Sequence, residues 1–408
     1  MAPRAPIYLD HHATTPTDPR VVEAMLPYFS REFGNAASHT HAFGWRAEAA
    51  VELARESLAR GIGARDPREI VFTSGATESN NLALRGAAEA ERGGRNHLVT
   101  VATEHSSVLD PCRALARRGF ELTELPVDGA GRVDPDAVAR AIGERTLAVS
   151  VMWANNEIGV IQPIEAIARV CRERGVLFHC DAAQAVAKIP VDAAASVVDL
   201  LSFTAHKLYG PKGVGALYVR AGRPRVRLEP LLHGGGHEGG LRSGTLPVPL
   251  IVGFARALEL ALAEREEEAL RLAGLRDHLL DRLRAALPDV FVNGDREQRL
   301  PGNLNVGFEG ISADALMAGL PDLALSAGSA CSSARPEPSH VLKALGLSDD
   351  AVKASIRIGL GRNNTLSEVD AAADRIIAEV KALRASRTVQ PAGSGGRSPR
   401  IDPSAARR

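Results

Sequence analysis

The chain has 408 residues, and its 49 lysines and arginines balance its 49 aspartates and glutamates. Two domains are expected at this length, and the balanced charge gives no indication of a nucleic-acid partner. No apolar run reaches membrane-spanning length, and the N-terminus lacks the apolar segment of a secretory signal. Four scattered cysteines exclude a disulfide framework, so the sequence predicts a protein of the reducing cytoplasm.

Short apolar runs alternate with helical stretches between about residues 65 and 220. We expect strands at 69–73, 97–101, 147–152, 176–180, 199–204 and 215–219. Helical stretches such as 134–142 and 163–174 separate most of these runs, which are apolar enough to be covered on both faces. This alternation predicts a mainly parallel α/β sheet with functional groups at the carboxyl ends of its strands. The last two strands, joined by the short turn 209–213, are expected to form an antiparallel hairpin.

A long helix is expected at about 249–287, where four leucines at helical spacing form one core-facing stripe: Leu272, Leu275, Leu279 and Leu283. A smaller domain follows at about 290–383. The tail 386–408 is rich in Gly, Pro, Ser and Arg and is expected to be disordered. The predicted division is a large domain at 16–260, a small domain made of 1–15 and 261–385, and the tail 386–408.

Two polar side chains follow neighbouring strands of this predicted sheet. Asp181 ends the run 176–180, and Lys207 follows the run 199–204. A lysine that binds an aldehyde as a Schiff base and an acid that keeps a ring nitrogen protonated are what pyridoxal phosphate (PLP) requires. A lone lysine after a strand is more often a surface residue, so the hypothesis depends on the motifs around it.

The segment 73–81 joins a strand to a helix and resembles a phosphate cradle. Gly75 allows a tight turn, and the helix that follows has free N–H groups and a positive dipole end that favour an anion. The same spacing of Ser or Thr and Glu is also that of a capping box, which is the alternative interpretation. The residues expected at the phosphate are Ala76 and Thr77 at the helix start, and Thr204 and His206 beside the lysine.

Cys331 lies among small residues and is followed closely by prolines, a composition typical of an exposed loop. An accessible thiolate there can act as a nucleophile, and a free surface cysteine is the alternative. The other three cysteines lie in apolar or helical contexts and are expected to be inert packing residues: Cys112, Cys171 and Cys180.

Together these motifs resemble the fold-type-I PLP enzymes of the class-V aminotransferase family, and the chain is similar to cysteine desulfurases of the NifS/IscS group. The resemblance covers about residues 7–384. The motifs that carry it lie at 8–10, 13–16, 33–35, 70–79, 103–105, 155–159, 202–213, 233–238, 242–247, 326–331 and 355–357. The chain departs from the usual family residues at His11, His12 and Ala205, and its C-terminal tail does not look like that of the family.

The resemblance implies PLP fold type I, with a large domain whose mainly parallel seven-stranded sheet is flanked by helices, and a smaller α+β C-terminal domain. It implies a homodimeric enzyme that converts L-cysteine into L-alanine and holds the sulfur as a persulfide on Cys331. Acceptor proteins would then take the sulfur for iron–sulfur cluster assembly or tRNA thiolation. Another PLP enzyme, such as a selenocysteine lyase or an aminotransferase, and a non-enzymatic protein of sulfur scaffolds are the competing hypotheses.

The resemblance also implies a role for each matching residue. Lys207 holds the cofactor and moves a proton, and His105 lies over the ring and shuttles protons. The expected catalytic residues are Lys207, Cys331 and His105. The expected cofactor-binding residues are Ala76, Thr77, Asn156, Asp181, Gln184, Thr204, His206, Lys207 and Thr245. The expected substrate-binding residues are Arg357 and Asn156.

These roles differ in their chemistry. Arg357 offers two parallel N–H donors that match a substrate carboxylate, and an arginine paired with an acid is the alternative. Thr245 is expected to reach the phosphate of the neighbouring subunit. Gln184 and Asn156 are expected to bind the phenolic oxygen or a substrate group, or else to be turn amides. No intrinsic metal site is expected, and the resemblance implies Cys331 as a ligand to an iron–sulfur cluster shared with a scaffold.

Overall fold

The computed structural model of the chain describes residues 6–222, 224–327 and 338–388. Seven strands form one large sheet in the spatial order β2-β8-β7-β6-β5-β3-β4. β8 is antiparallel to both of its neighbours, and the other pairs are parallel. The bounds of the strands are β2 Ile70–Thr73, β3 His97–Val101, β4 Glu121–Leu125, β5 Thr146–Ser150, β6 Leu177–Asp181, β7 Leu200–Thr204 and β8 Gly215–Val219.

Apolar side chains on alternate residues of these strands build a core on each face of the sheet. Phe72 packs into a cluster with α3 and α8, whereas the adjacent Val71 packs into a cluster with α4. Burial on both faces explains the continuous apolar runs of the sequence. The helices of this part are α1 Pro19–Met25, α2 Pro27–Ser30, α3 Ala42–Gly61, α4 Ala76–Ala90, α5 Ser106–Ala116, α6 Pro135–Ala141 and α7 Ile164–Glu173.

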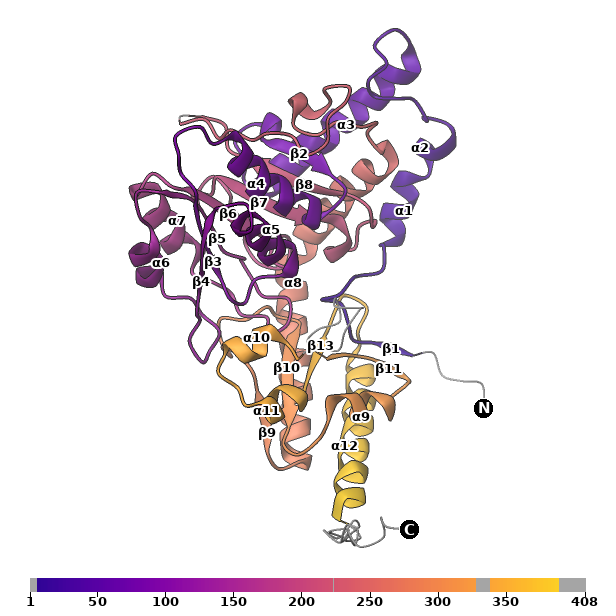
Figure 1. Cartoon of the computed structure of the whole chain (residues 1–408). Coiled ribbons are helices and arrows are strands. Elements are labelled where there is room, and N and C mark those ends of the chain that lie inside the picture. Colours follow the sequence, from indigo (N-terminus) through magenta and orange to yellow (C-terminus); the bar gives the residue numbers. More distant parts are fainter. Residues whose placement is uncertain (1–5, 223, 328–337, 389–408) are drawn as a thin grey trace, which may run out of the picture.

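The long helix α8, Val248–Ala286, runs from the large sheet into the lower part of the molecule (Figure 1). Its first half contributes Phe254 and Leu258 to the core of the large sheet. Its second half contributes a predicted leucine stripe to a separate core, and all four of these side chains are buried: Leu272, Leu275, Leu279 and Leu283. One helix therefore spans both cores.

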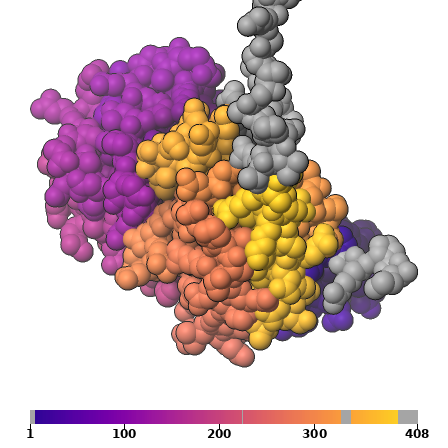
Figure 2. Space-filling model, turned by 90° about the horizontal axis from the view of Figure 1, so that it is seen from below, coloured from indigo at the N-terminus to yellow at the C-terminus, as the bar shows by residue number. Residues whose placement is uncertain are grey.

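The second core lies under a four-stranded antiparallel sheet in the order β12-β13-β10-β9. A parallel pair of short strands, β1 with β11, joins the N-terminus to this part. Figure 2 shows the orange and yellow segments of this part side by side on the face seen from below. The bounds are β1 Ile7–Tyr8, β9 Val290–Val292, β10 Asn303–Phe308, β11 Leu323–Ala324, β12 Ser326–Ala327, β13 Ser355–Gly359, α9 Ala313–Ala318, α10 His340–Ala344, α11 Asp349–Lys353 and α12 Leu366–Thr388.

The predicted α/β class, the seven-stranded sheet and the hairpin of β7 and β8 are confirmed. β4 is the strand that the apolar runs did not locate, because it forms the edge of the sheet and its residues are mostly exposed or half-buried. The disordered tail was predicted to begin at residue 386, but α12 continues through Thr388, so residues 386–388 are helical. The remainder of that tail, 389–408, lies outside the described residues, and the division into domains stays a prediction.

Within the described ranges, no helix is both long enough and apolar enough to span a membrane.

Leu279→Ala tests the position of the second core. Leu279 is 0 % exposed, so its truncation should lower the free energy of unfolding by about 2–5 kcal/mol through lost burial and a new cavity. Leu270→Ala is the matched control on the same helix, because Leu270 is 78 % exposed and its loss should change stability by less than about 0.5 kcal/mol. Urea unfolding followed by circular dichroism measures both, and equal losses would contradict this arrangement.

Candidate active site

Three of the predicted residues lie at the side of the large sheet where its parallel strands have their carboxyl ends. Asp181 is the last residue of β6, and Lys207 ends a short 3₁₀ turn, Ala205–Lys207, that directly follows β7. His105 follows β3 and is the N-cap of α5. β6 and β7 are parallel neighbours, and the carboxyl ends of parallel strands meet at the same edge. The charges of Asp181 and Lys207 both act on His105, which places the three side chains in one electrostatic environment.

Lys207 lies against the N-terminal segment of the chain. Its Nζ donates hydrogen bonds to the carbonyl oxygens of His12 at 2.6 Å and Ala13 at 2.7 Å. Beside it, the ring Nδ1 of His206 lies 3.1 Å from the hydroxyl oxygen of Thr14. Residues 12–14 therefore hold the turn that carries the lysine, although they are almost 200 positions away in the sequence.

Asp181 is a buried carboxylate surrounded by donors. Its Oδ1 accepts the backbone N–H of Ala183 at 2.9 Å, and its Oδ2 accepts the side-chain amide of Asn80 at 2.7 Å. His105 accepts the backbone N–H of Ser107 at its own Nδ1, at 3.1 Å, and burial lowers its pKa below the ordinary value. An acceptor-only carboxylate and an uncharged imidazole thus stand at the same sheet edge.

The segment predicted to bind phosphate contains the start of a helix, and this helix has no side-chain cap. Ala76 and Thr77 are the first residues of α4, and the N-cap is Gly75. The backbone of β8 touches this turn, because a Cβ at Gly215 would lie only 2.6 Å from the Cα of Gly75. The first N–H groups of a helix have no intrahelical partner, so this end can bind an anion.

Thr204 lies close to this turn, whereas no contact of Thr245 with the turn is present among the described residues. A Cβ added at Gly75 would lie 3.8 Å from the hydroxyl oxygen of Thr204, which donates to the carbonyl of Val214 at 3.1 Å. Thr245 is exposed. It follows Arg242, whose guanidinium pairs with Glu78 of α4 at 2.9 Å. The loop of Thr245 is therefore anchored to the cradle helix while Thr245 faces outward.

Gln184 belongs to a cluster that includes a second lysine. Its Nε2 donates to the carbonyl of His12 at 2.8 Å, and its Oε1 accepts from Nζ of Lys188 at 2.7 Å. Burial, followed by the charge of Lys207, lowers the pKa of Lys188 to about 7. A lysine with this pKa carries, on average, only part of a positive charge near Lys207 at neutral pH.

Arg357, on β13, is engaged in an ion pair. It is 3 % exposed, its Nη2 lies 2.6 Å from Oδ1 of Asp10, and its Nη1 donates to the carbonyl of Asn156 at 3.0 Å. Its Nε has no hydrogen-bond partner among the described residues. The acid-paired alternative is thus present in the structure, and a substrate carboxylate would have to join Asp10 or replace it.

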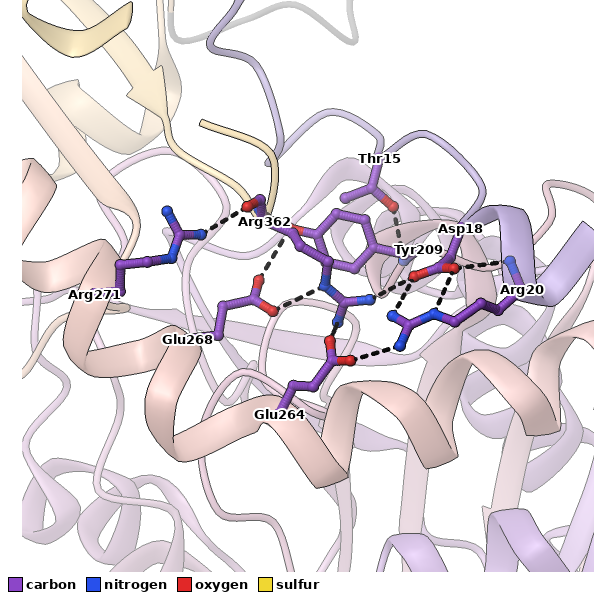
Figure 3. Close-up of polar contacts among 8 residues, drawn as sticks. All are labelled: Thr15, Asp18, Arg20, Tyr209, Glu264, Glu268, Arg271 and Arg362. Atoms are coloured by element: carbon purple, nitrogen blue, oxygen red, sulfur yellow. Dashed lines mark hydrogen bonds and ion pairs between the residues drawn. The ribbon is translucent and has the colours of Figure 1, made fainter. Parts of the chain in front are cut away.

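The turn after Lys207 is held by a charged network (Figure 3). Tyr209 has a φ of 64°, which is costly for a residue with a side chain. The guanidinium of Arg362 lies 4.2 Å over the Tyr209 ring and pairs with Asp18 at 2.9 Å and Glu268 at 3.0 Å. These contacts tie the turn to the N-terminal segment, to α8 and to the segment after β13.

Cys331 lies outside the described residues, in the interval that follows β12. The other three cysteines are buried, as predicted for packing residues. Burial raises the pKa of Cys112 and of Cys171 to about 12, and that of Cys180 well above its ordinary value. The described part of the chain contains no cluster of three or more side chains that could ligate a metal ion.

Sequence reasoning missed several side chains that the fold brings to this site. They are Asp10, Asn80, Lys188 and Arg362. Asp10 had a signal, because it lies inside one of the motifs that carried the family resemblance. Asn80 lies inside the segment 73–81 that the sequence analysis singled out for another role, whereas nothing in the local pattern distinguishes Lys188 and Arg362 from surface residues.

The arrangement fits PLP in its donor set. Asp181 would offer a carboxylate to a ring N–H, Lys207 would offer an amine to an aldehyde, and the start of α4 would offer uncapped N–H groups to a phosphate. A cavity of about 470 Å³ runs along α4 and α5 beside this edge, and its lining includes Thr77 and His105 but neither Asp181 nor Lys207. Fold and site together define a fold-type-I PLP enzyme.

Comparison with known proteins identifies the family. Residues 7–372 match the aminotransferase class-V family, and the chain belongs to it. It is 56 % identical over 381 residues to the cysteine desulfurase IscS of Anaeromyxobacter dehalogenans (strain 2CP-C), covering 93 % of this chain and 94 % of that protein.

Two solved structures are also similar to this chain. One, described as a NifS-like protein, aligns with a TM-score of 0.86 and 38 % identity over 92 % of this chain and all of its own. The other, SspA in complex with cysteine, aligns with a TM-score of 0.77 and 38 % identity over 87 % of this chain and 98 % of its own. The predicted family and its cofactor, PLP, are confirmed by these matches.

Glu157, next to Asn156, should make stability depend on pH. Burial raises its pKa from the ordinary 4.5 to about 7, although the hydroxyl of Ser339 donates to its Oε2 at 2.6 Å. Between these two values the folded state keeps a proton that the unfolded state has lost, so the free energy of unfolding should fall as pH rises from 4.5 to 7.

Glu157→Gln removes this titration. Wild-type protein should lose roughly 3 kcal/mol relative to the variant between pH 4 and pH 8, measured by urea unfolding across that range. Glu173→Gln is the control, because Glu173 is exposed at the end of α7 and its variant should follow the wild-type profile. Parallel profiles for wild type and Glu157→Gln would show that Glu157 does not hold a proton in the folded state.

Proposed function

We propose that this protein is a PLP-dependent cysteine desulfurase that converts L-cysteine into L-alanine and keeps the sulfur for transfer. The observation that carries the proposal is the 56 % identity to a named cysteine desulfurase over 93 % of this chain. The polar side chains at one sheet edge support it: Asp181, Lys207 and His105.

The roles of the polar residues follow from their chemistry. PLP, when bound, withdraws electrons from the Cα of the amino acid attached to it. Asp181 holds the proton on the ring nitrogen, and the Nζ of Lys207 removes and returns the proton at Cα. Ala76, Thr77, Thr204 and His206 bind the phosphate.

Arg357 binds the substrate carboxylate in this proposal. Its guanidinium can donate two parallel hydrogen bonds to a carboxylate, and its Nε, which has no partner among the described residues, is one of the donors. Asp10 already pairs with Nη2, so substrate binding would redistribute that ion pair rather than create a new one. Gln184 and Asn156 assist at the phenolic oxygen or at the substrate.

Cys331 takes the sulfur. Its thiolate forms a bond to the substrate sulfur while the sulfur–carbon bond breaks, and the electron pair of that bond passes to the carbon that becomes the methyl group of alanine. The product on the enzyme is a persulfide, which is a reversible modification of cysteine. A thiol of an acceptor protein can take its outer sulfur atom and restore the cysteine. Sulfur acceptors would be iron–sulfur scaffold proteins or tRNA-thiolation proteins, and a reducing cytoplasm is the expected location for a reactive thiol.

A homodimer with shared active sites is also part of the proposal. Aromatic side chains on α2, α3 and the loop between them are strongly exposed, as is typical of an interface: Phe29, Phe33, Phe43 and Trp45. A hollow of about 1400 Å³ near this patch is lined by Ala36 and His39, and by His237 and Leu246 from the loop of Thr245. This loop could thus reach the phosphate site of a partner.

An aminotransferase is the competing PLP enzyme, and Cys331→Ala distinguishes the two. The variant should keep the visible absorbance of bound PLP and lose at least a hundredfold in alanine formation from cysteine, because the sulfur has no acceptor. Lys207→Ala should lose the absorbance band itself. Cys112→Ala is the control with a buried thiol and should keep both properties. Undiminished alanine formation by Cys331→Ala would show that Cys331 is not the sulfur acceptor, whereas an aminotransferase would form a 2-oxo acid from cysteine and no alanine.

A mixed dimer tests the role of Thr245. Thr245→Ala should weaken PLP binding about tenfold, since a hydrogen bond to a phosphate is lost. A dimer of one Lys207→Ala chain and one Thr245→Ala chain should regain one wild-type site, with half the activity of the normal dimer at limiting PLP. If Thr245 serves its own chain, the mixed dimer has no intact site and activity stays low.

A further inference from the structure

A buried row of hydrogen bonds joins Asp181, at the end of β6, to His105 at the start of α5. The amide nitrogen of Asn80 lies 2.7 Å from Oδ2 of Asp181 and 2.9 Å from the hydroxyl oxygen of Ser107. That hydroxyl lies 2.8 Å from Nδ1 of His105. Asn80 is 0 % exposed, Asp181 5 % and Ser107 8 %, so the two contacts of the Asn80 amide are shielded from water, whereas His105 is half-buried.

The direction of each hydrogen bond in this row is fixed by donor chemistry. A carboxylate can only accept, so Asn80 must turn its NH₂ group, and not its carbonyl, toward Asp181. The second hydrogen of that NH₂ group is then donated to the hydroxyl of Ser107. The single hydrogen of the hydroxyl is left for Nδ1 of His105.

Nδ1 of His105 therefore faces two donors. Besides the hydroxyl, the backbone N–H of Ser107 donates to it at 3.1 Å. A nitrogen that accepts two hydrogen bonds carries no proton, so the ring proton belongs on Nε2. Protonation of Nδ1 would create a donor–donor contact with the backbone N–H of Ser107, and the hydroxyl of Ser107 would have to turn its hydrogen away from the ring.

We propose that Ser107 and Asn80 are positioning residues that hold His105 as a neutral imidazole with its proton on Nε2. His105 then acts as a hydrogen-bond donor, and proton abstraction at the substrate carbon falls to Lys207. This inference rests on the proposed PLP-dependent function for its role in catalysis, whereas the protonation of the ring itself does not depend on turnover.

The electrostatic surroundings of His105 agree with a neutral ring. Burial is the largest effect and lowers its pKa; Lys207 and His340 lower it further, while Asp181 and Asp110 raise it. The ring also caps the positive end of α5, which disfavours an added positive charge. A neutral histidine at a helix start is an established way to supply a hydrogen-bond donor in catalysis.

Nuclear magnetic resonance of the PLP-loaded protein with ¹⁵N-labelled histidine tests the proposal. Long-range ¹H–¹⁵N spectra distinguish a protonated ring nitrogen from an unprotonated one, and His105→Gln identifies the signals of His105. We expect an unprotonated Nδ1 and a protonated Nε2 at neutral pH. Ser107→Ala should raise the pKa of His105 by about one unit, because one hydrogen bond to the neutral form is lost.

Two further variants separate this effect from a general disturbance. Ser107→Thr keeps the hydroxyl and should restore the pKa of His105, whereas Ser106→Ala, at the exposed neighbouring position, should not change it. The acidic limb of the pH profile of kcat/KM should move upward with the same one-unit shift in Ser107→Ala.

A proton on Nδ1 in the unmodified protein, or an unchanged His105 titration in Ser107→Ala, would overturn the inference. Alanine formation from cysteine is measured on the same samples. If alanine forms but Nδ1 of His105 carries the proton, only this inference is wrong. If Nε2 carries the proton but no alanine forms, only the proposed function is wrong.

Discussion

The segment from residue 10 to residue 18 links the two halves of the active site. It accepts the hydrogen bonds of Lys207, which follows the large sheet, and it supplies Asp10 to Arg357, which lies on the small sheet. Each hydrogen bond contributes only about 1 kcal/mol, but loss of Asp10 would leave the buried guanidinium of Arg357 without the carboxylate that compensates its charge. The distance between lysine and arginine, and so the size of substrate they can hold, depends on this segment.

Many charges are buried around that segment, and their arrangement reduces what they cost. Lys188 lies in the cluster of Lys207 and Gln184, and its lowered pKa of about 7 relieves the repulsion between two neighbouring amines. Arg362 is compensated by carboxylates of Asp18 and Glu268 and by the ring of Tyr209. The lowered pKa of Lys188 and the positive φ of Tyr209 both lie around this segment, and such features are common at functional sites.

The two proposed reaction steps use different kinds of structure. The PLP-facing groups stand on strand ends and helix starts of a packed sheet, where a buried row of hydrogen bonds can fix the state of His105. The sulfur-accepting Cys331 belongs to the interval after β12, which the described structure does not include. A packed cofactor site combined with a thiol in a segment whose composition predicts a loop suits an enzyme that must activate one substrate and then present its product to another protein.

The sequence by itself determined the secondary structure of the buried sheet, the leucine stripe of α8 and the strand-end positions of Asp181 and Lys207, because periodicity and chemistry at strand ends are local properties. It also carried the motifs of the family. Tertiary structure alone decided the position of β4 at the sheet edge, the pairing of Asp10 with Arg357, and the row through Asn80 and Ser107. These contacts join residues up to 347 positions apart, and their partners are chosen by strand order and packing, which no local pattern records.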